Sequence, residues 1–159
     1  MQGEFFPPVA PPPLTREQRF IYAAGLFDGE GYVGLEFSKR PRATVLLLVV
    51  QVQMSTPQGP ALFAELFGGR VRIQQRRSLN VTGKPYRPMY FWRLCAAKAI
   101  PVLVALRPYL REKAAQVDLC LEARRIQQNR PQGQGAFYRR EDRARVGEIH
   151  AQVRALKRT

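Results

Sequence analysis

One nine-residue stretch dominates what can be inferred from this chain: Ala23-Ala24-Gly25-Leu26-Phe27-Asp28-Gly29-Glu30-Gly31. A threonine and a glutamine three residues apart, at 15 and 18, form a capping-box pattern upstream of it and predict a helix from about 16 to 28. Its last two glycines are expected to break the helix, and the alternating residues of 32–38 are typical of a strand. Two carboxylates are therefore expected at a corner between a helix and a strand.

Acidic side chains are poorly placed at the C-terminal end of a helix, because the helix dipole is negative there. Asp28 and Glu30 therefore require an offsetting partner, which can be a cation, a basic group or a structural hydrogen bond. A divalent metal with oxygen ligands answers this requirement most directly. Asp-Gly and Glu-Gly pairs are also ordinary turn chemistry, so a purely structural role stays open at this point.

Ala24 and Gly25 put two small residues together on the predicted helix, where they would let another backbone approach closely. The stretch 23–31 resembles the motif of the LAGLIDADG homing endonucleases, with Ala23 in place of the first Leu and Glu30 in place of the last acidic residue. In that family the small residues let two such helices pack together, and the acidic residue binds the catalytic metal.

The resemblance implies specific roles for several side chains. Glu30, assisted by the backbone carbonyl of Gly29, would bind Mg2+, and a helix–helix interface would include Ala24, Gly25 and Asp28. The segment 108–113 is also similar to the family, and it places Lys113 near the scissile phosphate as the basic catalytic residue. Without the resemblance, Lys113 would be interpreted as a solvated lysine on a helix flank.

The resemblance does not extend to every position. The family often has a glutamine a few residues after the second strand, where this chain places Met54, next to Gln53. The water-organising role of that glutamine therefore has no clear counterpart here.

We expect one domain over 15–159, with a proline-rich arm at 1–14 and a C-terminal helical extension from about 128. After the first helix, the pattern predicts strands at 32–39, 43–54, 70–77 and 86–95, and helices at 60–67, 98–106, 108–127 and 141–157. This order, αββαββα, indicates an α+β fold whose antiparallel sheet has helices on one face. The resemblance implies the same LAGLIDADG endonuclease-like architecture, with a curved, saddle-shaped sheet that lies along a DNA duplex.

The charge of the chain indicates a polyanionic partner. It has 26 Lys and Arg against 12 Asp and Glu, for a net charge of +14, and 21 of the basic residues are Arg. Ten basic and two acidic residues fall between 36 and 93, where the strands are expected. Charge alone does not separate DNA from RNA, because counterion release is independent of sequence.

Strand alternation predicts that Val33, Leu35 and Phe37 point to the helices and that a second set of side chains points outward. Trp92 is assigned to the core, which turns Arg93 toward DNA, although the reverse register is an open alternative. The expected DNA-contacting residues are Tyr32, Glu36, Ser38, Arg40, Arg42, Gln51, Arg70, Arg72, Gln74, Arg76, Arg77, Lys84, Arg87 and Arg93. Arg and Gln in a major groove discriminate bases by bidentate hydrogen bonds.

These observations predict a site-specific double-strand DNA endonuclease that hydrolyses phosphodiester bonds with Mg2+. One motif copy supplies one active site, so cutting both strands requires a homodimer and a long pseudo-palindromic target. The resemblance implies an intron-encoded homing endonuclease. Two alternatives use the same scaffold: an intron-RNA-binding maturase, and a DNA-binding regulator without cleavage.

The remaining features narrow the setting. No apolar run is long enough for a membrane helix, and the two cysteines, Cys95 and Cys120, favour an intracellular, reducing compartment such as cytoplasm, nucleoid or an organelle. The lone His150 argues against a histidine-based nuclease. The C-terminal helix is expected either to clamp the DNA flank or to pack on the domain through an apolar stripe of Val146, Ile149, Val153 and Leu156.

Overall fold

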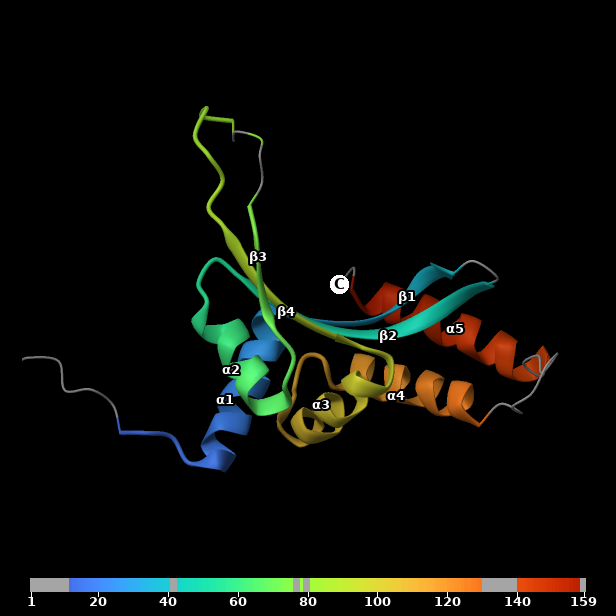
Figure 1. Ribbon diagram of the computed structural model, residues 1–159. Coiled ribbons are helices and arrows are strands. Elements are labelled where there is room, and N and C mark those ends of the chain that lie inside the picture. Colours follow the sequence, from blue (N-terminus) through green and yellow to red (C-terminus); the bar gives the residue numbers. More distant parts are fainter. Residues whose placement is uncertain (1–11, 41–42, 76–77, 79–80, 130–139, 158–159) are drawn as a thin grey trace, which may run out of the picture.

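The chain folds into one antiparallel sheet with helices packed on one of its faces (Figure 1). This computed structural model describes residues 12–40, 43–75, 78, 81–129 and 140–157. The strands are β1 (Gly31–Arg40), β2 (Ala43–Met54), β3 (Val71–Gln74) and β4 (Met89–Cys95), in the order β1-β2-β4-β3. The helices are α1 (Arg16–Glu30), α2 (Gln58–Phe67), α3 (Ala99–Leu106), α4 (Ala114–Gln128) and α5 (Arg140–Leu156). The predicted α+β architecture is confirmed.

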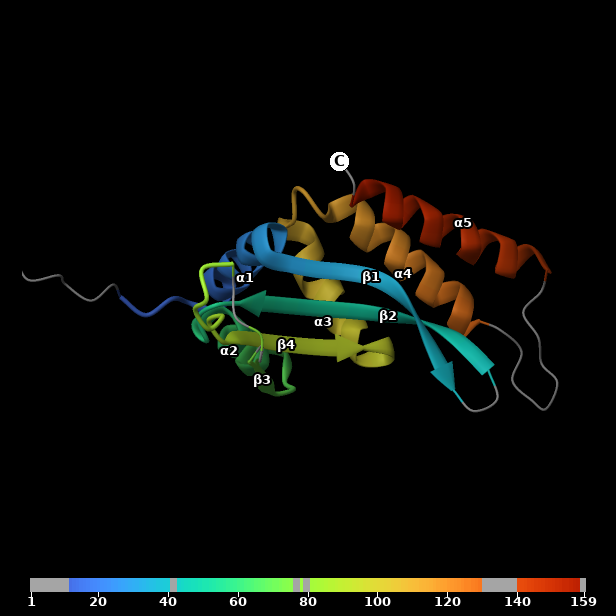
Figure 2. The same ribbon diagram turned by 90° about the horizontal axis from the view of Figure 1, so that it is seen from above.

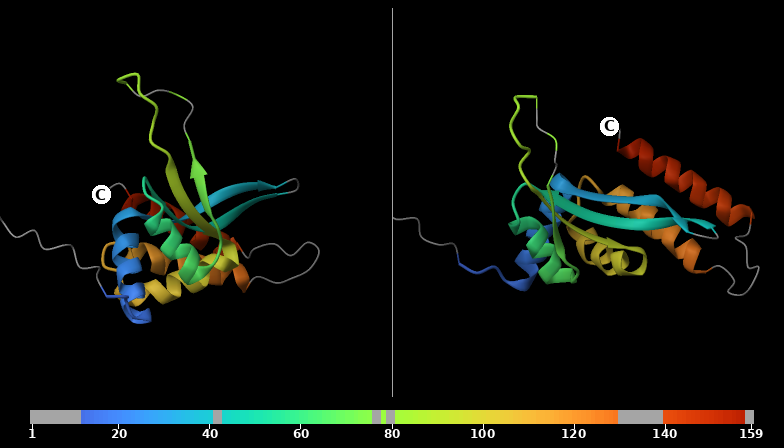
Figure 3. Two further views of the ribbon diagram at one scale, coloured as in Figure 1. Left: turned by 60° about the vertical axis from the view of Figure 1, so that its left-hand side comes forward. Right: turned by 45° about the horizontal axis from the view of Figure 1, so that its top comes forward.

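The sheet is curved, and its two ends rise away from the helices (Figures 1 and 3). Seen from above, the strands lie over the helical layer, and α5 lies to the β1 side of the sheet (Figure 2). The concave face opposite the helices is called the outer face below. None of the helices in the described part of the chain is long and apolar enough to cross a membrane.

The corner after α1 differs from the sequence prediction in one respect. The capping box is present, with Thr15 and Gln18 exchanging hydrogen bonds of 2.8 and 3.3 Å. The helix runs through Gly29 to Glu30, so Gly29 does not break it. Gly31 ends it, and its extended backbone (φ −79°) is open to any residue, but a Cβ there would overlap the ring and carbonyl of Phe27. Glycine is needed at 31 for space.

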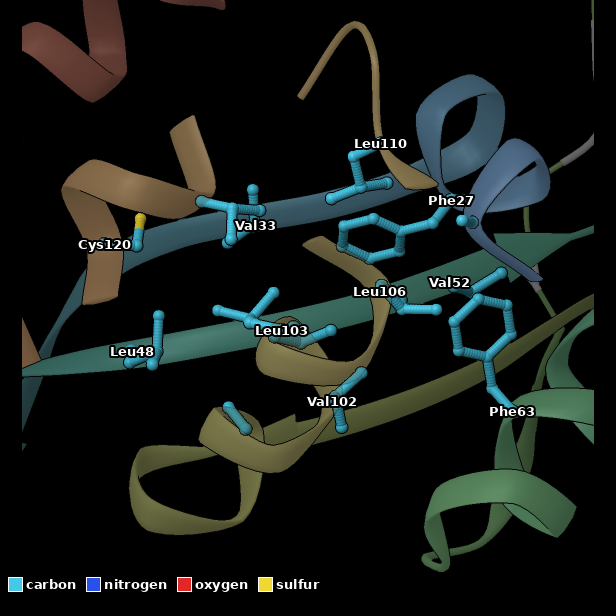
Figure 4. Close-up of a cluster of buried hydrophobic side chains, with 14 of the residues drawn as sticks. Phe27, Val33, Leu48, Val52, Phe63, Val102, Leu103, Leu106, Leu110 and Cys120 are labelled. Carbon is cyan, nitrogen blue, oxygen red and sulfur yellow. The ribbon is translucent and has the colours of Figure 1, made fainter. Parts of the chain in front are cut away.

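The core lies between the sheet and the helices, where aromatic and aliphatic side chains from both layers meet (Figure 4). Phe27, Phe63 and Trp92 are fully buried, and the ring centroids of Phe63 and Trp92 are 5.2 Å apart. The Trp92 indole N–H donates a 2.7 Å hydrogen bond to the Gly68 carbonyl, which satisfies its buried polar atom. The prediction that Trp92 faces the core is confirmed. Phe37 lies on the same face of β1 as Val33 and Leu35, as predicted, and its ring meets that of His150 in α5, but it remains 67% exposed.

Several helices and strands are shorter than the sequence predicts. β3 stops at Gln74 and β4 begins at its partner Met89, because the preceding residue, Pro88, lacks the N–H that a strand ladder requires. Pro108 lies in a single 3-10 turn, Arg107–Tyr109, and the extended backbone of Leu110 separates this turn from α4. The predicted helix 108–127 is therefore two elements with a loop between them.

The C-terminal helix packs on the domain. Val146, Ile149 and Val153 are buried, as the apolar stripe predicts. Arg145 makes a bidentate contact to Glu122 of α4, with distances of 2.8 and 3.1 Å. At its C-terminal end, Lys157 reaches the outer face of β1 and lies 3.8 Å from the centre of the Tyr32 ring.

The first prediction concerns the corner glycine. Gly31→Ala should lower the free energy of unfolding by about 1–3 kcal/mol, because the added methyl group collides with Phe27. Urea denaturation followed by circular dichroism measures the change. Gly147→Ala, at an exposed position of α5, is the matched control: no atom lies within 4 Å of its new Cβ, so it should not destabilise the protein. Equal losses in the two variants would contradict this account.

Candidate active site and nucleic-acid interface

The loop before α4 is fastened to the end of α1 by one carboxylate. Asp28 Oδ2 accepts a 2.7 Å hydrogen bond from the backbone N–H of Arg111, and Oδ1 accepts one of 3.0 Å from the backbone N–H of Lys113. This is the structural hydrogen bond that the sequence left open as a partner for Asp28. Both hydrogen-bond donors to this carboxylate belong to the same protomer. Its expected place at a helix–helix interface stays a prediction.

The side chain of Lys113 makes a second contact between the loop and the end of α1. Its ammonium group donates to the backbone carbonyl of Asp28, which is one of the last carbonyls of α1. A cation is favourable there, because the C-terminal end of a helix carries partial negative charge. Residues more than eighty positions apart in sequence are thus brought to the corner that contains Glu30.

Glu30 is the last residue of α1 and is exposed. Among the described residues, none donates a hydrogen bond to its carboxylate, in contrast to the doubly bonded Asp28. The two acids of the corner are therefore different in kind. Asp28 is used to build the corner, and Glu30 is available to a ligand.

The donor set at this corner suits a hard cation. The Glu30 carboxylate and the backbone carbonyl of Gly29 are oxygen donors of the type that Mg2+ prefers. The described residues of one protomer contain no group of three His, Cys, Asp or Glu side chains that could hold a metal. A metal here would need ligands from outside the protomer, such as water, phosphate or a second copy of Glu30.

The outer face gathers most of the predicted DNA-contacting side chains that the structure describes. Cross-strand partners share a face, and the pairings Tyr32–Gln51, Gln51–Arg93 and Arg72–Phe91 connect all four strands. The predicted residues on this face are Tyr32, Glu36, Ser38, Gln51, Arg72, Gln74 and Arg93.

The other predicted contacts lie at the edges of this face. Arg70 precedes β3, while Lys84 and Arg87 lie in the long segment between β3 and β4, and all three are exposed. Arg40 is the last residue of β1. Arg42, Arg76 and Arg77 lie outside the described residues.

Arg93 is the centre of a side-chain network on the outer face. Its guanidinium donates to Glu36 Oε2 of β1 at 2.7 Å and to Gln51 Oε1 of β2 at 3.3 Å. It also donates to the Cys95 sulfur at 3.5 Å, and the Gln51 amide donates to Gln53 at 3.3 Å. Sequence reasoning did not identify the roles of Cys95 and Gln53, because cross-strand proximity has no local signature.

Tyr32 connects this network to the C-terminal helix. Burial, followed by the neighbouring Glu36 carboxylate, raises the pKa of Tyr32 to about 12, so its hydroxyl stays protonated. The Lys157 ammonium covers its ring. Tyr32, predicted as a DNA contact, is thus partly occupied by contacts within the protein.

The last residue of β2, Met54, is apolar. Met54 shares its face with Tyr90 and packs with the core, and its sulfur lies where a Cβ on Gly59 would be. Gln53 points to the opposite face and bonds to Gln51. The glutamine that the resemblance expects at this position is therefore not replaced by a neighbour.

No protein-family model matches this chain, and no curated protein matches it. Solved structures do resemble it. The homing endonuclease I-CvuI, in complex with its target and calcium, superposes with a TM-score of 0.63 at 19% identity, over 88% of this chain and 82% of that one. The archaeal intron-encoded homing endonuclease I-Vdi141I, complexed with DNA, gives 0.63 at 14% identity, over 87% and 83%. The LAGLIDADG homing endonuclease I-GzeII, in complex with its DNA target, gives 0.58 at 15% identity, over 86% and 43%.

The second prediction tests the loop fastening. Asp28→Asn has one acceptor oxygen in place of two, so one backbone N–H of the loop is left unpaired and the free energy of unfolding should fall by about 1–3 kcal/mol. Chemical denaturation measures it. Asp118→Asn, which breaks an exposed pair with Arg107, is the control and should have little effect. The loop is not fastened by Asp28 if the two variants are equally stable.

Proposed function

Because the chain has the LAGLIDADG homing endonuclease fold, we propose that it is a site-specific double-strand DNA endonuclease that works as a homodimer with Mg2+. The observation that carries the proposal is the meeting of Glu30 and Lys113 at the C-terminal end of α1. The presence of this carboxylate and this lysine at one corner supports the two roles that the resemblance implies for these positions.

The chemistry divides among three side chains. Glu30 and the Gly29 carbonyl would hold the metal, which when bound supplies charge stabilisation and an activated water. The Lys113 ammonium, which bonds to the Asp28 carbonyl at the end of α1, would contact a phosphate oxygen and stabilise negative charge on it. Asp28 holds the loop that carries Lys113.

The exposed face of α1 supports a homodimer. Gly25 and Gly29 are exposed and one helical turn apart, and no atom lies within 4 Å of a Cβ built on either one. Their neighbours Ile21 and Tyr22 are 48% and 58% exposed, which leaves an apolar surface without a partner among the described residues. A second α1 can approach this face closely because the glycines have no side chain.

The lengths of the similar structures agree with this assembly. The chain covers 82% of the I-CvuI chain but 43% of the I-GzeII chain, which is long enough for two such units. Two copies of this chain would supply an equivalent pair. A two-fold axis through α1 would place two Glu30 corners together and would match a pseudo-palindromic DNA site.

The setting follows from the same proposal. Both cysteines are free thiols, and burial raises the pKa of Cys120 to about 12, which keeps it unreactive. From the free thiols we expect a reducing, intracellular compartment. From the proposed homing endonuclease function we expect an intron-encoded origin.

The third prediction separates cleavage from binding. Glu30→Gln should cut a randomised duplex library at least about 100-fold more slowly in Mg2+ while still shifting the same DNA in a gel. The matched control is Glu17→Gln, which removes an acid from the first turn of the same helix and should keep cleavage. If Glu30→Gln cuts both strands at the wild-type rate, the catalytic assignment is wrong. If the wild type binds an RNA pool as well as it binds the DNA library and cleaves no DNA, a maturase would be favoured.

The fourth prediction tests the dimer. Gly25→Leu should keep the circular dichroism of the wild type, because its side chain enters open space in the protomer, but should sediment as a monomer. Gly147→Leu, on an exposed and equally open position of α5, should remain a dimer. A dimeric Gly25→Leu protein would place the interface elsewhere.

A further inference from the structure

Glu36 is an unexpected residue on the surface that we assign to DNA. It is the only acidic residue in the four strands, and it lies on the outer face among arginines and glutamines. A carboxylate on a surface that meets phosphates is repelled by them. Its presence therefore needs a compensating role.

The contacts of Glu36 point to a partner within the protein. Its Oε2 accepts the 2.7 Å hydrogen bond from the Arg93 guanidinium. The contact to Arg93 joins two charged groups, which makes it stronger than a neutral hydrogen bond. The carboxylate is thus occupied before any nucleic acid arrives.

Arg93 is restrained from three directions. Glu36 on β1, Gln51 on β2 and Cys95 on its own strand each accept one of its N–H groups. A free arginine samples many rotamers, and fixing it costs entropy on binding. Here the side chain is already fixed in the folded protein, so it is preorganised for a ligand.

The guanidinium is still accessible. The Arg93 side chain is 37% exposed and Glu36 is 36% exposed, and the three contacts do not use all of the arginine's N–H groups. A planar donor held over a concave surface matches the paired acceptors O6 and N7 on the major-groove edge of guanine.

We propose that Glu36 is a positioning residue that fixes Arg93 in one orientation, from which Arg93 reads one guanine in each half of the DNA site. This inference rests on the proposed DNA-binding function of the outer face. Glu36 itself contacts no base. The alternative is that Glu36 accepts a hydrogen bond from a cytosine amino group, independently of Arg93.

The test is a binding selection from a randomised duplex pool in the presence of EDTA, which measures base preference without cleavage. The wild-type dimer should select guanine at one position in each half-site. Arg93→Ala should lose that preference by about 10-fold. Glu36→Ala should weaken preference at the same position and at no other, and it should have no further effect on base preference in an Arg93→Ala background.

The matched control is Glu65→Ala. Glu65 pairs with Arg19 at 2.6 Å in the helical layer, so the variant loses the same charge and a similar ion pair away from the outer face. It should leave every base preference unchanged, which separates positioning from a general charge effect. Glu36→Gln keeps the shape of the side chain and provides the same test, with a smaller loss, if Glu36→Ala folds poorly.

The outcomes distinguish the two proposals. Selected sites with an unchanged guanine preference in both Glu36 variants would overturn the positioning role alone. A preference altered at a position different from that of Arg93→Ala would show that Glu36 reads its own base, and would also overturn it. Failure of the wild type to retain any duplex would overturn the DNA-binding function and this inference together.

Discussion

The two backbone hydrogen bonds accepted by the Asp28 carboxylate are the constraint on which the candidate active site depends. They connect the last turn of α1 to the loop before α4, and they hold Lys113 where its ammonium group reaches a helix-end carbonyl. Because these two N–H groups satisfy the Asp28 carboxylate, only one acid of the corner, Glu30, has no hydrogen-bond donor among the described residues at the negative end of the helix. Asp28 thus builds the corner, and Glu30 is the acid that the proposed function assigns to the metal.

The glycines in α1 and the glycine that follows it have different structural roles, although the sequence alone does not distinguish them. Gly31 is required because the Phe27 ring and carbonyl occupy the volume of a side chain, so it serves the fold of the protomer. Gly25 and Gly29 face open space, so they contribute nothing to the protomer that alanine would not. Their use lies in what approaches the helix from outside, which is why the proposed dimer follows from an exposed surface.

The two faces of the sheet show a similar division. The inner face is closed by Phe63, Trp92 and their neighbours, and the Trp92 indole N–H is satisfied there by the Gly68 carbonyl. The outer face holds a connected set of charged and polar side chains that are ordered by one another across three strands. Such a surface is already arranged for a ligand with a fixed pattern of donors and acceptors, since little side-chain entropy remains to be lost on binding.

The sequence by itself determined the α+β order, the capped first helix, the burial of Trp92 and the identity of Glu30 and Lys113 as candidates, because these rest on local periodicity, capping and a short motif. It overestimated the strands next to Pro88, which lacks a ladder N–H, and the helix after residue 108, which the extended backbone of Leu110 interrupts. Only the tertiary structure decided that Asp28 fastens the 110–113 loop, that Glu36 holds Arg93, and that Lys157 covers Tyr32. Each of these contacts joins residues distant in sequence, and such a contact depends on how elements pack in space, which no local pattern of residues specifies.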